Sequence, residues 1–297
     1  MRRLILIGIL ILLTSACGGQ PASDSGTTDP VILASTTLLA DIAQNVAGAR
    51  VQIGSLLPNG ADPHSYQYTP QDVAKVAAIK LLIMNDERYE VFMEPLLYSA
   101  GGEMEFVFAS TGVSKRVDFD MGGFDPHVWL DPNNVILYVE NIREGLTHFD
   151  PDGAAEYKSN ADSYIAELTA LDAWIVEQVN RIPSEKRLLV TNHEAFFYFA
   201  ERYGFTVVGS VLESFSTDAS PSAQQMASLI DQILLSGAPA IFLDAGDNPT
   251  LAQQIADETG VTVVTDLHLE SLTDGAPAAT YIDMMKHNVM QIVNALK

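Results

Sequence analysis

The chain has 297 residues, with 38 acidic and 16 basic side chains and a formal net charge of −22 at pH 7. Binding to nucleic-acid phosphates requires a basic face, so this charge argues against a nucleic-acid-binding protein. An acidic surface attracts cations only through a field that salt screens over about 8 Å, so it keeps a protein soluble but cannot select a metal.

The first residues have the pattern of a secretory signal. Met1 is followed by two arginines, an apolar stretch at 4–13 and small residues before Cys17. The apolar stretch is too short to span a membrane. We therefore expect a signal peptide at 1–16 that is removed on export.

Cys17 is the only cysteine of the sequence, so it cannot form an intramolecular disulfide. We expect it to carry a lipid after cleavage, although Thr14 stands where a lipidation motif usually has an aliphatic residue. An incidental cysteine near an ordinary cleavage site is the alternative. Residues 17–30 would then be the lipidated cysteine and a disordered tether, because they contain little that could be buried. The protein would be anchored to the membrane outside the cytoplasm, in the periplasm or on the outer cell surface.

Short apolar runs alternate with helix-like segments in both halves of the remaining chain. The runs are at 31–34, 51–57, 81–84 and 106–109 in the first half, and at 188–191, 206–211, 240–243 and 261–265 in the second. This alternation is typical of parallel βα units. We predict an α/β fold with two lobes, at 31–150 and 184–297, each with a parallel sheet of about four strands flanked by helices.

One long amphipathic helix is predicted between the lobes. Apolar residues recur at spacings of three and four from Tyr157 to Ile182, and Pro183 would end the helix. We expect this linking helix at 151–183. It would be about 45 Å long and could run along both lobes.

Three histidines and one glutamate lie in loops next to strand-like runs of both halves. They are His64, His127, His193 and Glu270. His64 is in a stretch rich in glycine and proline, and His193 comes shortly after the run at 188–191. Glu270 follows the run at 261–265. Ligands collect at the carboxyl ends of strands in open α/β sheets, so this distribution predicts one metal site built from both lobes.

The sequences around these residues resemble the zinc/manganese substrate-binding lipoproteins of bacterial ABC importers, the cluster A-I family, and its zinc-type branch in particular. The matching segments are Asp-Pro-His at 62–64, Asp-Pro-His-Val-Trp-Leu-Asp-Pro at 125–132, Thr-Asn-His-Glu-Ala-Phe-Phe-Tyr-Phe at 191–199, Glu-Ser-Leu at 270–272 and the segment 280–288. The resemblance implies that the metal ligands are His64, His127, His193 and Glu270. It also implies small lobe movements and delivery of the metal to an ABC permease driven by a cytoplasmic ATPase.

The ligand types bear on which metal is bound. Three imidazoles and one carboxylate complete the tetrahedral coordination of zinc, whereas manganese binds more weakly and suits oxygen ligands. Relatives devoted to manganese tend to have a carboxylate at the position of His193, and the resemblance of Glu270 is to the zinc-dedicated branch. We predict a monomer that binds one Zn²⁺ in the cleft between the lobes, with Mn²⁺ or both metals as the alternative.

The sequence contains three further histidines, His148, His268 and His287. His268 is close to Glu270 in sequence and could support a ligand or compete as one. His148, at the end of a helix, and His287, on the last helix, are expected at the surface or in a C-terminal turn. Residues 113–124 contain no histidine, so the His-rich loop of some zinc-binding relatives is absent.

The alternatives to a metal carrier are a zinc enzyme and a surface adhesin. His193 and Glu194 begin like a zinc-protease motif, but Phe197 stands where that motif requires a second histidine. Catalytic zinc also keeps one position open for water, which a fourth protein ligand would fill, so we expect no enzyme. A surface adhesin with a structural metal stays possible; it should unfold without metal, whereas a carrier must stay folded.

Overall fold

The computed structural model describes residues 31–86, 89–90, 93–118 and 123–297. The predicted signal peptide, the predicted lipid attachment at Cys17 and the predicted tether therefore lie outside the described residues. Within the described ranges, no helix is long and apolar enough to cross a membrane.

The first sheet is parallel, with its four strands in the order β2-β1-β3-β4. Both of its faces are covered, since Ile32 and Ala34 belong to the core that includes α1 and α4, whereas Leu33 packs with residues of α2 and α3. Burial on both faces explains why these strands are continuous apolar runs. The elements are β1 (Ile32–Ala34), α1 (Thr37–Ala47), β2 (Ile53–Ser55), α2 (Pro70–Ala78), β3 (Leu81–Met84), α3 (Met93–Ala100), β4 (Glu105–Phe108) and α4 (Pro132–Phe149).

The second sheet is also parallel, and its four strands have the order β10-β9-β7-β8. Val190 and Ile241 pack with residues of α7 and α8, whereas Leu189 and Phe242 belong to the core that includes α6 and α9. The elements are β7 (Leu188–Thr191), α6 (Phe197–Tyr203), β8 (Thr206–Ser210), α7 (Ala223–Ser236), β9 (Ala240–Asp244), α8 (Thr250–Thr259), β10 (Thr262–Leu267) and α9 (Tyr281–Leu296).

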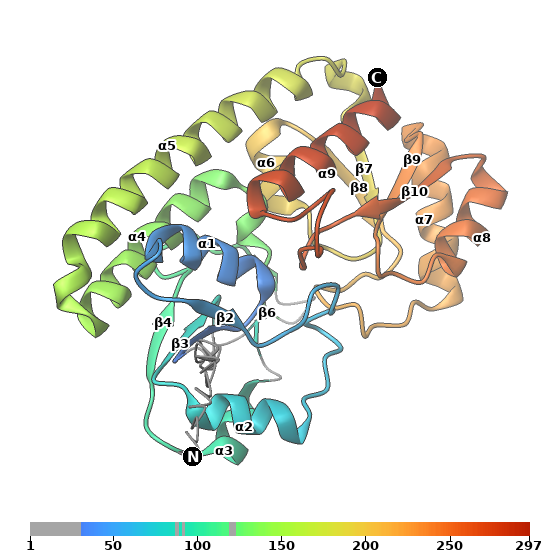
Figure 1. Cartoon of the computed structure of the whole chain (residues 1–297). Coiled ribbons are helices and arrows are strands. Elements are labelled where there is room, and N and C mark those ends of the chain that lie inside the picture. Colours follow the sequence, from blue (N-terminus) through green and yellow to red (C-terminus); the bar gives the residue numbers. More distant parts are fainter. Residues whose placement is uncertain (1–30, 87–88, 91–92, 119–122) are drawn as a thin grey trace, which may run out of the picture.

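The predicted fold is therefore confirmed: each of the eight apolar runs overlaps a strand, and the strands form two parallel sheets flanked by helices (Figure 1). A short antiparallel pair, β5 (Val117–Asp118) and β6 (Gly123–Phe124), was not predicted. Strands of two residues leave no alternation that a sequence pattern could show. The lobe boundaries at 31–150 and 184–297 stay predictions.

The long helix follows a turn of 3-10 helix, η2 (Pro151–Gly153), and is α5 (Ala154–Val179), with 26 residues. It packs against α4 and α1 beside the first sheet and against α9 beside the second, so it runs along both halves (Figure 1). The helix ends before the predicted Ile182, because the residues ahead of Pro183 tighten into bonds from Arg181 N to Gln178 O and from Ile182 N to Val179 O. Proline disfavours helical backbone at the residue that precedes it.

Candidate metal centre

The four predicted side chains come together at one point, although they are up to 206 residues apart. Glu270 Oε1 lies 2.8 Å from His64 Nε2, 3.0 Å from His127 Nε2 and 3.2 Å from His193 Nε2. His127 Nε2 is 3.4 Å from His64 Nε2 and 3.2 Å from His193 Nε2. Tetrahedral ligands about 2.1 Å from a zinc ion are about 3.4 Å from one another. The four donors, here called the central cluster, thus have nearly the spacing that a single metal ion requires.

Each ligand candidate comes from a different loop. His64 lies between β2 and α2, and His127 precedes a 3-10 turn, η1 (Val128–Leu130), that leads into α4. His193 follows β7, and Glu270 follows β10. The loop after β2 and the segment before α4 therefore supply two donors in the first half of the chain. Loops at the carboxyl ends of β7 and β10, in the second sheet, supply the other two.

The two Asp-Pro-His segments have the same local geometry. Asp62 Oδ1 accepts a hydrogen bond from His64 N at 2.8 Å, and Asp125 Oδ1 accepts one from His127 N at 3.0 Å. An aspartate that binds the backbone two residues ahead forms a compact turn, and the intervening proline stiffens it. The repeated motif thus holds each histidine on a rigid turn.

Asp125 also orients the ring of His127, since its Oδ1 lies 2.8 Å from His127 Nδ1 and both residues are fully buried. This contact turns His127 Nε2 toward the central cluster, as carboxylates commonly do for metal-binding histidines. His193 lacks such support, because its buried Nδ1 has no hydrogen-bond partner among the described residues. The sequence analysis assigned no role to Asp125. The signal that could have identified it is the second Asp-Pro-His segment, in which it repeats the position of Asp62.

The charges of the central cluster follow from these contacts. Burial lowers the pKa of His127, but hydrogen bonds to Asp125 and Glu270 outweigh burial and raise that pKa to about 9. Burial lowers the pKa of His193. Burial would raise the pKa of Glu270, but the charge of His64 and the hydrogen bonds from the three histidines hold that pKa well below its usual value. Without metal, the cluster therefore contains an ionised Glu270 paired with a protonated His127.

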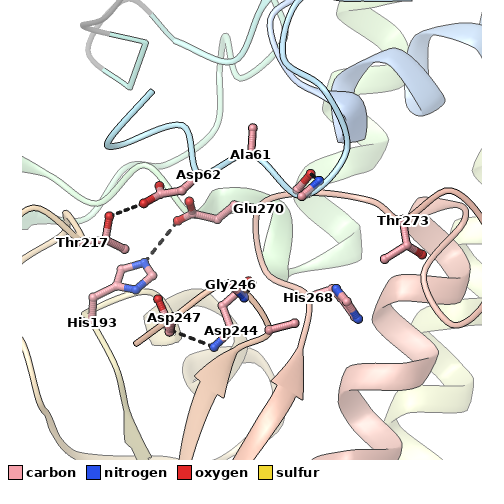
Figure 2. Close-up of a pocket in the computed structure, with 13 residues that line it drawn as sticks. Ala61, Asp62, His193, Thr217, Asp244, Gly246, Asp247, His268, Glu270 and Thr273 are labelled. Carbon is pink, nitrogen blue, oxygen red and sulfur yellow. Dashed lines mark hydrogen bonds and ion pairs between the residues drawn. The ribbon is translucent and has the colours of Figure 1, made fainter. Parts of the chain in front are cut away.

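The central cluster is nearly enclosed. His127 is 0 % exposed and Glu270 is 7 % exposed, and the rings of Tyr89 and Trp129 pack against the histidines. A cavity of about 320 Å³ adjoins the cluster; its lining includes His193, Glu270, Asp62, Asp244 and Asp247 (Figure 2).

The central cluster contributes to raised pKa values of two carboxyl groups that line this cavity. Burial and the charge of Glu270 raise the pKa of Asp244 to about 7 and that of Asp247 to about 6. An acidic lining that leads to an enclosed group of metal donors favours the approach of cations. Sequence reasoning also missed these aspartates, because the strand β9 that brings Asp244 to the cavity lies beside β10 only in the folded sheet.

Hydrogen bonds connect the loop that carries Glu270 to the first half of the chain. Trp129 Nε1 donates to Leu269 O at 2.7 Å, and Leu272 N donates to Thr37 Oγ1 at 2.9 Å. Gly60 N donates to Ser271 Oγ at 2.7 Å. Residues on both sides of Glu270 are thus held in position by hydrogen bonds to the first half of the chain.

The remaining histidines lie elsewhere. His268 does not belong to the central cluster (Figure 2); its Nε2 lies 3.9 Å from Asp266 Oδ1. His148 has a side chain 83 % exposed, as predicted. His287 lies on α9, where its side chain is 17 % exposed and its Nε2 donates to Asp266 O at 2.7 Å. Glu194 accepts a hydrogen bond from Ser210 Oγ at 2.6 Å and does not contact the cluster.

Comparison with known proteins gives consistent results over the whole folded part. The chain matches the family model described as ZnuA, zinc-uptake complex component A periplasmic, over residues 32–295. It is 32% identical to the manganese-binding lipoprotein MntA of Halalkalibacterium halodurans over 296 residues, which cover 98% of this chain and 97% of that protein. It is 33% identical to the iron-binding protein YfeA of Yersinia pestis over 282 residues, 94% of this chain and 90% of that protein.

Among solved structures, the periplasmic zinc binding protein TroA from Treponema pallidum aligns with a TM-score of 0.83 and 29% sequence identity. The alignment covers 91% of this chain and 99% of that one. The names of these similar proteins mention manganese, iron and zinc, so similarity alone does not select one metal.

Proposed function

Because the chain belongs to the ZnuA family of substrate-binding components of metal ABC transporters, we propose that it captures Zn²⁺ outside the cytoplasm and delivers it to an ABC permease. The family consists of transport components, which confirms the prediction that the chain is not an enzyme. The permease, with its ATPase, would be the partner. Zinc would be bound by His64, His127, His193 and Glu270, one ion per chain.

The observation that supports zinc is the donor set of the central cluster. Five of the six pairs among three imidazole nitrogens and one carboxylate oxygen lie 2.8 to 3.4 Å apart in a nearly closed site. Zinc accepts such a set in tetrahedral geometry, whereas manganese favours oxygen-rich sites of higher coordination number. The alternative is a manganese carrier or one for both metals, and it is supported by relatives such as MntA that are named for manganese.

Capture would exchange a proton for the metal. The proton on His127 must leave when Nε2 binds the ion, and Asp125 would keep the ring in place during the exchange. With neutral imidazoles the loaded site would have a charge of +1, which the carboxylates of Asp125 and of the adjoining cavity would partly offset. Zinc should therefore bind less tightly as the pH falls.

A carrier is favoured over an adhesin with a structural metal by the protein contacts of the Glu270 loop. Trp129, Thr37 and Gly60 bind this loop through hydrogen bonds that need no metal. We expect the metal-free protein to stay folded, with small movements of the lobes along α5. The lipid anchor at Cys17, the location outside the cytoplasm and the monomeric state belong to the same proposal.

The test is a competition titration of chelator-stripped protein with Zn²⁺ and Mn²⁺ against a calibrated metal indicator. We expect one tight zinc site that manganese cannot displace, and loss of that site in His127→Ala. His148→Ala replaces an exposed histidine outside the cluster and should bind as the parent does. Comparable binding of both metals would favour the manganese alternative, and absence of any tight site would refute the carrier proposal.

The adhesin alternative has its own measurement. Thermal unfolding of the stripped protein should show a cooperative transition that zinc shifts upward. A structural site would instead give a protein that lacks this transition until zinc is added.

A further inference from the structure

We propose a second binding site for a divalent transition-metal ion at the contact between β10 and α9, formed by Asp266, His268 and His287. Among the described residues, two groups of three or more histidine and acidic side chains have donor atoms that all lie within 4.8 Å of one another. One is the central cluster, and the other is this group. The three residues are here called the peripheral cluster. The inference does not rest on the proposed transport function.

The distances fit donors that share an ion. Asp266 Oδ2 lies 3.3 Å from His287 Nε2, and Asp266 Oδ1 lies 3.9 Å from His268 Nε2. Two ligands that are each about 2.1 Å from a zinc ion can be at most about 4.2 Å apart. Both separations lie below that limit; the one at His287 is close to the roughly 3.4 Å of tetrahedral ligands, whereas the one at His268 is about 0.5 Å longer, so an ion would draw these two donors together. The separation at His268 is too long for a hydrogen bond.

His268 supplies an independent observation. The residue is 8 % exposed, and its Nε2 is buried without a hydrogen-bond partner in the described part of the chain. Leaving a buried polar nitrogen unpaired is destabilising, so such atoms are rare unless something binds them. Because this nitrogen lies 3.9 Å from Asp266 Oδ1, and donor atoms of all three residues lie within 4.8 Å of one another, a cation between the three residues would satisfy it.

Helix α9 fixes the position of His268 relative to His287. Asn288 Oδ1 accepts from His268 N at 2.8 Å, and Asn288 Nδ2 donates to His268 O at 2.5 Å. These two bonds fix the backbone of His268 against the helix turn that carries His287. The two rings lie with their centroids 5.5 Å apart.

Hydrogen bonds compete with the metal at His287. Its Nε2 donates to Asp266 O at 2.7 Å, and Gln291 Nε2 donates to Asp266 Oδ2 at 2.9 Å. An ion would have to displace a proton from His287 Nε2 and turn the carboxylate of Asp266, whose side chain is 58 % exposed. Three protein donors also leave one tetrahedral position for water. The peripheral cluster should therefore bind more weakly than the central one.

Two imidazoles and one carboxylate select the class of ion. Imidazole suits zinc, copper and nickel, whereas calcium and magnesium prefer oxygen ligands alone. The ion would link the end of β10 to α9. Because Glu270 follows His268 after a single residue, it would also brace the segment that supplies a ligand to the central cluster.

The test measures zinc stoichiometry by equilibrium dialysis of the chelator-stripped full chain, with free Zn²⁺ raised well beyond saturation of the tight site. We expect two zinc ions per chain, the second bound more weakly, and one zinc ion in His287→Ala and in Asp266→Asn. His127→Ala should keep the weaker ion, and His148→Ala should bind two. Asp266→Asn alters an exposed side chain and covers the case in which His287→Ala fails to fold.

The proposal is overturned if the parent chain binds a single zinc ion, or if a second ion persists unchanged in both His287→Ala and Asp266→Asn. Failure of the transport proposal would look different, as loss of the tight site with the weak site retained. Co²⁺ added to His127→Ala gives a second readout, because a nitrogen and oxygen site of low coordination number should produce visible absorption that His287→Ala abolishes.

Discussion

Two groups of histidine and carboxylate side chains in this protein differ in how completely the fold holds their donors. In the central cluster, Glu270 Oε1 lies within 3.2 Å of three imidazole nitrogens, and loops from both sheets supply the donors. In the peripheral cluster, the end of one strand, the residue after it and one helix supply three donors, and the side chain of Asp266 is 58 % exposed. Donors that are already in place lose less conformational entropy on binding, so convergence of several rigid loops favours high affinity.

The largest expected effect comes from removing the carboxylate at the centre. Glu270→Ala should weaken zinc binding by the central cluster by roughly a thousandfold, about 4 kcal/mol, because three imidazoles would hold a doubly charged ion with no nearby ligand charge. The competition titration measures it. The peripheral cluster has its own carboxylate, so its binding should not change. A loss below tenfold would show that Glu270 is not a ligand.

A smaller effect is expected at the residue that orients His127. Asp125→Asn keeps the size of the side chain but removes its charge, and it should lower zinc affinity by about 10 to 100-fold. Asp162→Asn, at a side chain of α5 that is 58 % exposed, is the matched control. Equal affinities of the two variants would mean that the turn alone positions His127.

The pH dependence should report the proton on His127. In the metal-free protein, burial lowers its pKa, but the hydrogen bonds to Asp125 and Glu270 raise it to about 9. Below that pH zinc must displace a proton, so affinity should increase roughly tenfold per unit from about pH 7 to about pH 9 and then level off. Calorimetry in buffers with different ionisation heats measures the released proton. Binding without proton release would contradict this charge assignment.

The smallest effect concerns the loop that presents Glu270. Trp129→Phe removes the hydrogen bond from Trp129 Nε1 to Leu269 O and leaves that buried oxygen without this partner, at a cost of about 1–3 kcal/mol. We expect a lower midpoint of thermal unfolding and a few-fold loss of zinc affinity at the central cluster. Unchanged affinity with lowered stability would show that other contacts of the loop suffice.

Much of the fold could be predicted because its signals are local. The parallel strands are buried on both faces, so they appear as short apolar runs, and α5 shows the three- and four-residue spacing of an amphipathic helix. The pair β5 and β6 could not be predicted, because two residues show no period. The Asp-Pro-His segments were recognisable since proline and a turn-forming aspartate hold each histidine within three residues of chain.

The alternation of strands and helices and the long connecting helix follow from the sequence, because periodicity depends on neighbouring residues, and the resemblance of short segments to a known family identified the four side chains of the central cluster. Features that depend on how strands and helices are placed relative to one another follow from the tertiary structure alone. Asp244 reaches the cavity because β9 lies beside β10. His268 faces His287 because α9 packs on the end of β10, through contacts between residues 20 apart in the chain. No local pattern encodes such a contact, since it arises from packing across the whole domain.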